Sequence, residues 1–142
     1  MRREYKLFIQ DILDSIKEIE EFVGDMDFNE FYSDRKTRSA VVLKIEIIEE
    51  ATKNIPKEIK AKYKGLPWKN MAGMRDKTSH FYFGIDYKIV WNVIKKRLPE
   101  IKSEVENILK EMEKHKRNIS CRNGFDKVPN KNKKEKKGKL PP

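Results

Sequence analysis

The chain has 142 residues, the length of one domain, with a net charge of +10 and 39% charged residues. It has no uncharged apolar stretch of about 18 residues, which argues against a membrane protein. Asp11 and Asp14 interrupt the apolar run that an N-terminal signal peptide would need. We therefore expect a cytoplasmic protein without membrane association.

Few residues are available for chemistry. The single cysteine, Cys121, can form neither an internal disulfide nor a Cys-rich zinc site. The two histidines, His80 and His115, cannot form a multi-histidine metal cluster. The sequence also lacks glycine-rich phosphate-binding motifs and the HExxH motif. We expect no metal and no cofactor.

The positive charge is concentrated at the C-terminus. Residues 113–142 hold eleven Lys and Arg against three acids, a net charge of +8, which leaves +2 for residues 1–112. Because this segment has little to bury and strong self-repulsion, we predict a disordered lysine-rich tail over 113–142 and a folded domain over 1–112. Such a tail can bind nucleic acid through phosphates, or it can simply keep the protein soluble.

Apolar residues recur at helical spacing along the folded part. A first helix is predicted from residue 5 to 23, followed by a hinge turn over 28–32. Ser33 or Asp34 can cap a second helix that runs to about Asn54. The stripe of the first helix consists of Tyr5, Ile9, Ile12, Ile16, Ile19 and Val23, and the inner face of the second of Ala40, Val41, Ile45, Ile48 and Ala51.

Proline and glycine divide the remainder of the domain. A brief helix is predicted from Pro56 to Tyr63, and another from Trp68 to about Tyr82, with Gly84 at its C-terminal end. Asp86 can cap a helix over 87–98, and Pro99 should break or kink the chain. A last helix should then run to about Met112, with its inward face formed by Ile101, Val105, Ile108 and Leu109.

These patterns predict an all-α fold. No segment alternates with period two, so we expect no strands. Antiparallel helices of this number and length favour an up-and-down helical bundle. The large aromatic residues Phe8, Phe22, Trp68 and Trp91 are expected in its core.

One segment combines residues suited to phosphate chemistry. Arg75, Asp76, His80 and Tyr82 lie within eight residues. The guanidinium of Arg75 matches a phosphate, and His80 can act as a general base near neutral pH. This pair suffices for RNA cleavage without a metal, leaving a 2′,3′-cyclic phosphate and a free 5′-hydroxyl. The spacing alone also occurs by chance.

Helix geometry adds a constraint to this pair. On an ideal helix Tyr82 falls about 20° from Arg75 in projection, whereas His80 falls about 140° away. Either the helix loosens before Gly84, or a symmetric dimer brings two sets of these side chains into one cleft. We favour the homodimer.

At this point the sequence resembles a known family. The signature Arg-[Asn/Asp]-x3-His-x-Tyr of the HepT-like branch of the HEPN superfamily is filled by Arg75, Asp76, His80 and Tyr82. The resemblance extends from about Tyr5 to about Leu109. The matching flanks are Glu46-Ile47-Ile48, Glu50-Ala51, Pro67-Trp68, Gly73-Met74, Phe83-Gly84-Ile85-Asp86 and Val90-Trp91.

The resemblance implies a HEPN helical bundle that dimerises and acts as the toxin of a two-gene toxin–antitoxin module. Active members are metal-independent RNA endonucleases whose catalytic residues correspond to Arg75 and His80. Their partner is an MNT-type nucleotidyltransferase antitoxin, which transfers AMP from ATP to the tyrosine that corresponds to Tyr82. The alternative is a non-catalytic module that binds a nucleotide or serves as the docking partner of the nucleotidyltransferase.

Some supporting residues remain open. Glu46 and Glu50 share a helix face and could orient Arg75 or His80, or could form ordinary ion pairs with Lys44, Lys53 or a neighbouring helix. Asp76 could orient His80 or be surface charge, and Tyr82 could be a core tyrosine. The chain departs from the family where many members have arginine at position 43 and glycine at 49, because it has Leu43 and Glu49.

Overall fold

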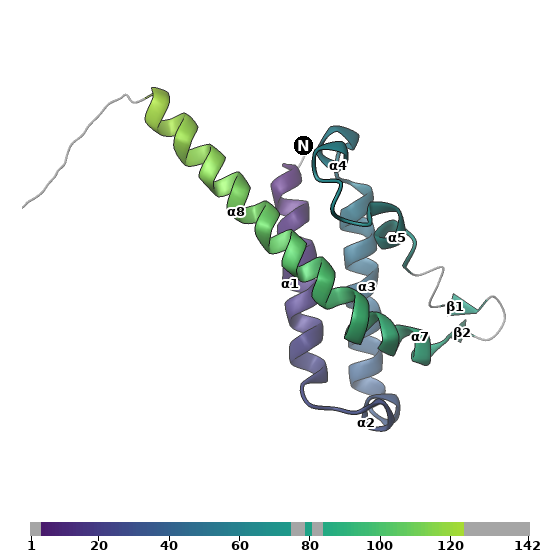
Figure 1. Cartoon of the computed structure of the whole chain (residues 1–142). Coiled ribbons are helices and arrows are strands. Elements are labelled where there is room, and N and C mark those ends of the chain that lie inside the picture. Colours follow the sequence, from purple (N-terminus) through teal and green to yellow (C-terminus); the bar gives the residue numbers. More distant parts are fainter. Residues whose placement is uncertain (1–3, 75–78, 81–83, 124–142) are drawn as a thin grey trace, which may run out of the picture. The chain divides into compact units, whose positions relative to one another are not determined.

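A computed structural model describes the backbone of residues 4–74, 79–80 and 84–123, and the side chains of residues 4–74 and 84–114. The chain divides into two units, 1–108 and 109–142. Helices dominate the described residues (Figure 1), which confirms the predicted all-α bundle of HEPN type. The elements in chain order are α1 (Tyr5–Val23), α2 (Phe28–Ser33), α3 (Arg35–Lys53), α4 (Lys57–Lys62), α5 (Trp68–Ala72), β1 (Ser79–His80), β2 (Gly84–Ile85), α7 (Tyr87–Asn92), the π-helical turn η1 (Val93–Arg97) and α8 (Leu98–Asn123).

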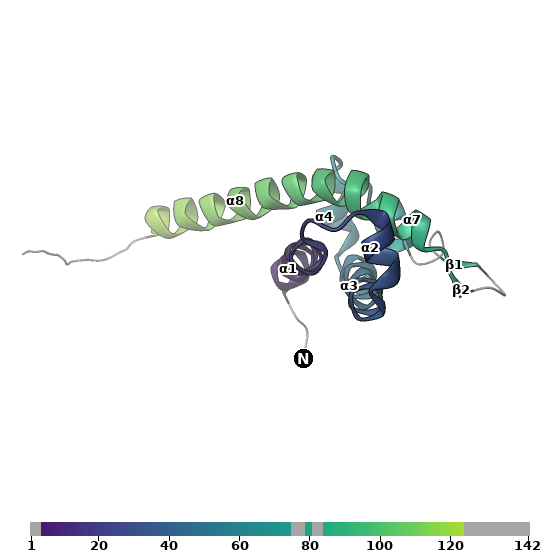
Figure 2. The ribbon, with the colours of Figure 1, turned by 90° about the horizontal axis from the view of Figure 1, so that it is seen from below.

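Helices α1 and α3 form the centre of the first unit, where they pack side by side (Figures 1 and 2). The predicted stripe of α1 is confirmed from Ile9 to Val23, because its members are buried, whereas Tyr5 at its start is 38% exposed. Ion pairs of 2.8 Å join α1 to its neighbours, from Glu18 to Lys44 of α3 and from Glu20 to Lys102 of α8. The bond to Glu20 raises the pKa of Lys102. Deep burial of this aliphatic seam is the main contribution to stability.

The predicted hinge turn over 28–32 is wrong, because these residues form helix α2. A capping box begins it: Glu30 N donates to Asp27 Oδ1 at 2.8 Å, and Asp27 N donates to Glu30 Oε1 at 3.0 Å. Phe31 is fully buried. Asp34, one of the two predicted caps, then begins α3 by accepting from Thr37 N at 3.1 Å, and this bond lowers the pKa of Asp34.

The aromatic residues expected in the core are only half-buried. Trp68 is one of them, and its Nε1 donates to the carbonyl oxygen of Tyr63 at 2.8 Å. An indole N–H needs an acceptor when the ring is partly buried, and this carbonyl oxygen supplies it. The half-buried set is Phe8, Phe22, Trp68 and Trp91.

The helix predicted from Trp68 to about Tyr82 is interrupted at Gly73, after which Met74 is helical again, and it does not include His80, which lies in a strand. Helix α5 ends at Ala72, and Gly73 N donates to the carbonyl oxygens of Lys69 and Asn70. Further on, β1 pairs antiparallel with β2, with Ser79 opposite Ile85 and His80 opposite Gly84. The expectation of no strands is therefore wrong for this two-residue ladder, and Gly84 belongs to β2 rather than to a helix end.

The C-terminal helices form a nearly continuous rod through η1. Asp86 caps α7 as predicted, accepting from Lys88 N and Ile89 N. Pro99 does not break the helix, because it lies in the first turn of α8, directly after the wide turn of η1. Helix α8 continues to Asn123 instead of ending at about Met112. The rest of the predicted tail, 124–142, lies outside the described residues. In the described part of the chain, no helix is long and apolar enough to cross a membrane.

Candidate functional site

The motif segment lies between α5 and α7. His80 is placed by its backbone in β1, opposite Gly84 of β2. Arg75, Asp76 and Tyr82 lie outside the described residues, as does the side chain of His80. Their predicted roles therefore stay predictions.

The extended backbone at Ser79–His80 changes the geometric argument for a dimer. A projection of 100° per residue relates two positions only along one unbroken helix. Because His80 lies in a strand, the projection cannot place His80 on the far side from Arg75. Of the two alternatives, an interrupted helix before Gly84 is the one that this backbone has. The homodimer now depends on the family resemblance alone.

The return from His80 to α7 depends on Gly84. Its φ of 81° lies in the left-handed region that favours glycine. A Cβ added here would meet no atom within 4 Å, so the backbone angle and not the available space requires glycine. Two residues later Asp86 begins α7. The short sequence Gly84-Ile85-Asp86 therefore closes the ladder and starts the next helix.

The carboxylates of α3 differ in their surroundings. Glu50 is exposed, and its Oε2 accepts from Asn54 Nδ2 at 3.3 Å. Glu46 is half-buried and has interactions of its own. Glu49 is only 6% exposed, with Oε1 3.9 Å from Lys53 Nζ. Lys44, one of the possible partners considered for Glu46 and Glu50, pairs with Glu18 of α1.

Sequence reasoning had not proposed Glu49 for the site. A buried carboxylate requires hydrogen-bonding or charged partners. The signal in the sequence is its spacing, since Glu49 lies one residue after Ile48 and four after Ile45, on the buried side of α3. Helix α3 packs against both α1 and α5, so Glu49 lies in the helix that supports the segment leading to the motif.

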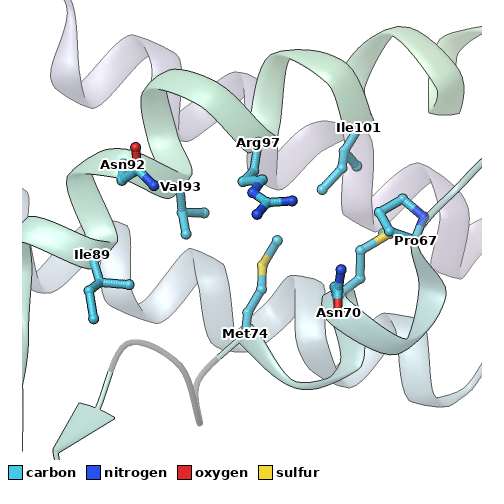
Figure 3. A pocket seen from close by; sticks show the side chains of 9 residues that line it. Pro67, Asn70, Met74, Ile89, Asn92, Val93, Arg97 and Ile101 are labelled. Carbon is cyan, nitrogen blue, oxygen red and sulfur yellow. The ribbon is translucent and has the colours of Figure 1, made fainter.

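A cavity of about 110 Å³ lies between α5 and the rod formed by α7, η1 and α8. Figure 3 shows the side chain of Arg97 extending from η1 toward Met74, the residue directly before Arg75. This space is smaller than the cavity of about 150 Å³ that holds benzene. It is lined by Pro67, Asn70, Met71, Met74, Ile89, Asn92, Val93, Arg97 and Ile101.

Arg97 is a second candidate that sequence reasoning missed. Its guanidinium is always charged and can bind a phosphate. In the sequence it ends the run Lys95-Lys96-Arg97 and looks like ordinary surface charge. Only the fold brings it beside the segment that carries the motif. Among the described residues, no group of three or more His, Cys, Asp or Glu could hold a metal ion.

Comparison with known proteins adds to this geometry. A family model described as "Ribonuclease HepT-like" matches residues 12–108. The chain is 43% identical over 112 residues to "Putative RNase MJ0127" of Methanocaldococcus jannaschii, which covers 79% of this chain and 93% of that protein. It is 46% identical over 112 residues to "Putative RNase MJ0125" of the same organism, covering 79% and 97%.

A third relative comes from another genus. The chain is 42% identical over 110 residues to "Probable ribonuclease HepT" of Thermococcus cleftensis, covering 78% of this chain and 100% of that protein. No solved structure matches the chain significantly. The family match spans most of the described bundle and includes the whole motif segment, so the chain belongs to the HepT-like ribonuclease family.

Proposed function

We propose that this protein is a metal-independent RNA endonuclease and the toxin of a two-gene toxin–antitoxin module. The observation that carries the proposal is the complete signature, Arg75, Asp76, His80 and Tyr82, in a member of a ribonuclease family. A protein that served only for docking would have no chemical need of both a cation and a general base in this segment.

In the proposed reaction His80 takes the proton from a ribose 2′-hydroxyl. The 2′ oxygen then attacks the adjacent phosphorus, and the bond from phosphorus to the 5′ oxygen breaks. Arg75 stabilises the negative charge that builds up on the phosphoryl oxygens. A proton delivered to the leaving oxygen completes the step, which gives a 2′,3′-cyclic phosphate and a 5′-hydroxyl.

Regulation would act on Tyr82. An MNT-type nucleotidyltransferase would transfer AMP from ATP to its hydroxyl, giving O-AMP-tyrosine and releasing pyrophosphate. The new phosphate would lie close in sequence to Arg75 and would compete with RNA for the same cation. This proposal, like that of a homodimer in the cytoplasm, rests on the resemblance of the motif and its flanks.

Growth and RNA integrity test the nuclease. We expect induction of the chain in a bacterial host to stop growth and to produce RNA fragments with cyclic phosphate ends. His80→Ala and Arg75→Ala should each abolish both effects while the protein remains folded. His115→Ala, at the other histidine of the chain, is the matched control and should stay toxic. Purified protein should cleave single-stranded RNA in the presence of a chelator.

Two results would contradict this function. A His80→Ala protein that is still toxic would remove the mechanism. Absence of cleavage by folded, unmodified protein would favour the alternative, a docking or nucleotide-binding partner of the nucleotidyltransferase.

Labelled ATP tests the modification. With the neighbouring nucleotidyltransferase and ATP labelled at the α-phosphate, we expect label on the parent chain and none on Tyr82→Phe, because the acceptor oxygen is gone. Tyr5→Phe, at an exposed tyrosine of α1, should be labelled like the parent. Growth arrest by Tyr82→Phe should then resist the partner. Full neutralisation of this variant would instead indicate inhibition by binding.

A further inference from the structure

An open groove of about 530 Å³ lies where α2 approaches α7, which Figures 1 and 2 show side by side next to the β1–β2 ladder. We call it the aromatic groove. Tyr32 is 51% exposed, although it is a large aromatic residue. The lining consists of Phe28 and Tyr32 from α2, and Ile85, Asp86, Tyr87 and Lys88 from β2 and α7.

Neighbouring rings hold Tyr32 in position. The rings of Phe28 and Tyr32 stack at 5.8 Å with planes 29° apart. The rings of Tyr32 and Tyr87 meet edge to face at 6.1 Å and 74°. A ring fixed on two sides loses little further conformational entropy when a flat ligand stacks on it. The groove is therefore a preformed platform for a planar group.

Two cations to which the described residues supply no carboxylate partner lie against these rings. Arg38 Cζ is 5.0 Å from the centroid of the Tyr32 ring and 4.6 Å from that of Tyr87. Among the described residues, Arg38 Nε is buried and has no hydrogen-bond acceptor. Lys88 Nζ lies 5.6 Å from the Phe28 ring, and no described acid pairs with it. Such cations attract an anion.

The acid of the groove does not cancel this charge. The Oδ1 atom of Asp86 accepts from the backbone N–H groups of Lys88 at 3.0 Å and Ile89 at 3.3 Å. Its negative charge is thus directed at the start of α7, where it caps the helix. A ligand that combines a flat ring with a phosphate fits a platform of aromatic rings beside Arg38 and Lys88.

The position of the groove connects it to the motif. Ile85 in its lining directly follows Gly84, which is the ladder partner of His80. We propose that the aromatic groove binds an unpaired base of single-stranded RNA by stacking on Tyr32, while Arg38 and Lys88 attract the adjoining phosphate. This subsite rests on the proposed ribonuclease function and would hold a nucleotide close to the bond that is cut.

Single-stranded rather than duplex RNA follows from the chemistry. Only an unpaired base can leave its stack and offer a free face to the Tyr32 ring, and every base has such a face. The groove should therefore favour single strands without strong sequence preference. This restricts the proposed nuclease to loops and unpaired regions of RNA.

Binding to full-length protein in a His80→Ala background tests the subsite, because this change is designed to prevent cleavage. With a short fluorescein-labelled oligouridylate, we expect Tyr32→Ala to weaken binding about 5- to 150-fold, the usual effect of removing one stacked base. Tyr32→Phe keeps the ring and should bind like the parent. Tyr5→Ala, which removes an exposed tyrosine of α1, is the matched control and should leave binding unchanged.

Salt dependence tests the cation. If Lys88 contacts one phosphate, Lys88→Ala should make the slope of log K against log salt shallower by about 0.7. Lys17→Ala, at an exposed lysine of α1, should leave the slope as it is. Thermal melts of each variant show that the fold is kept.

Several outcomes would overturn the subsite. These are unchanged binding by folded Tyr32→Ala, equal Tyr32-dependence for duplex RNA, a loss of dimer mass in Tyr32→Ala, or a loss of protein-partner binding with RNA binding intact. Failure of the nuclease is distinguishable: no cleavage by the His80 parent, together with Tyr32-dependent RNA binding, would contradict the proposed function and leave the subsite standing. Cleavage together with Tyr32-independent binding would contradict the subsite and leave the proposed function standing.

Discussion

Glu49 is the charged side chain that the described part of the bundle buries most completely. Its neighbour Glu50, one residue further, remains exposed. Removing one partner of a buried polar contact leaves the other unsatisfied, whereas the same change at the surface costs little. Glu49 and Glu50 have the same side chain at adjacent positions. A comparison of the two therefore tests how much the burial of a carboxylate in α3 contributes to stability.

We expect Glu49→Gln to lower the free energy of unfolding by about 1–3 kcal/mol, because the neutral amide no longer matches the surroundings of the buried carboxylate. Glu50→Gln should change it by less than about 0.5 kcal/mol. Urea unfolding followed by circular dichroism measures both. Equal effects of the two changes would show that Glu49 has no special partner.

At the scale of helices and strands, the hydrophobic periodicity and the capping residues of the sequence predict the long helices. The stripe from Ile9 to Val23 and the cap at Asp34 are found as expected, since both depend on neighbours close in the chain. Helix α2 was missed although its capping box Asp27-x-x-Glu30 is visible in the sequence. The ladder at His80 could not be predicted, because two residues are too few to show alternation.

The candidate site divides in the same way. Arg75, His80 and Tyr82 are identified by a sequence signature that needs no structure. The approach of Arg97 to Met74 and the pairing of Arg38 with Tyr32 are contacts between different elements. No local sequence pattern predicts them. Sequence therefore identified the proposed chemistry, while the surroundings of the motif required the fold.

Among the described residues, Gly24 and Gly84 have positive φ, and they provide a prediction for the ladder. A side chain in this region costs about 1–2 kcal/mol of backbone strain. Gly84→Ala should open the β1–β2 ladder opposite His80. We therefore expect RNA cleavage to fall about tenfold or more, the effect typical of a misplaced catalytic group. The melting temperature should stay nearly unchanged, because a two-residue ladder adds little to global stability. Gly24→Ala strains the end of α1 in the bundle instead. It should lower the melting temperature and leave the cleavage rate of folded protein intact.

Cleavage assays and thermal melts of both glycine variants check this crossed pattern. If Gly84→Ala cleaves RNA at the parental rate, the ladder does not position His80. If Gly24→Ala loses activity below its melting temperature, strain at the end of α1 reaches the site through the bundle.

At the scale of the whole molecule, charge is separated along the chain. Residues 124–142 hold seven lysines and two acids, half of the net charge of +10. Cutting the chain after Asn123 leaves α8 complete and lowers the net charge to +5. This change removes electrostatic attraction for RNA without removing any residue of the proposed site.

We expect this shortened protein to bind RNA more weakly, with the slope of log K against log salt shallower by up to roughly 5 if every lysine contacts a phosphate. Its cleavage rate at saturating RNA should stay the same, because the chemistry lies elsewhere. Titrations at several salt concentrations measure the slope. An unchanged slope would mean that the segment serves solubility alone.

The π-helical turn Val93–Arg97 makes the length of this region as important as its composition. It keeps Val90, Ile94 and Leu98 inward at steps of four residues, where a regular helix would drift. Loss of one residue here would restore regular winding and leave Leu98 inward, because alternating steps of three and four residues follow one face of an α-helix. Relatives should therefore tolerate the loss of one residue in this turn better than a further insertion, provided that the buried positions Val93 and Ile94 stay apolar.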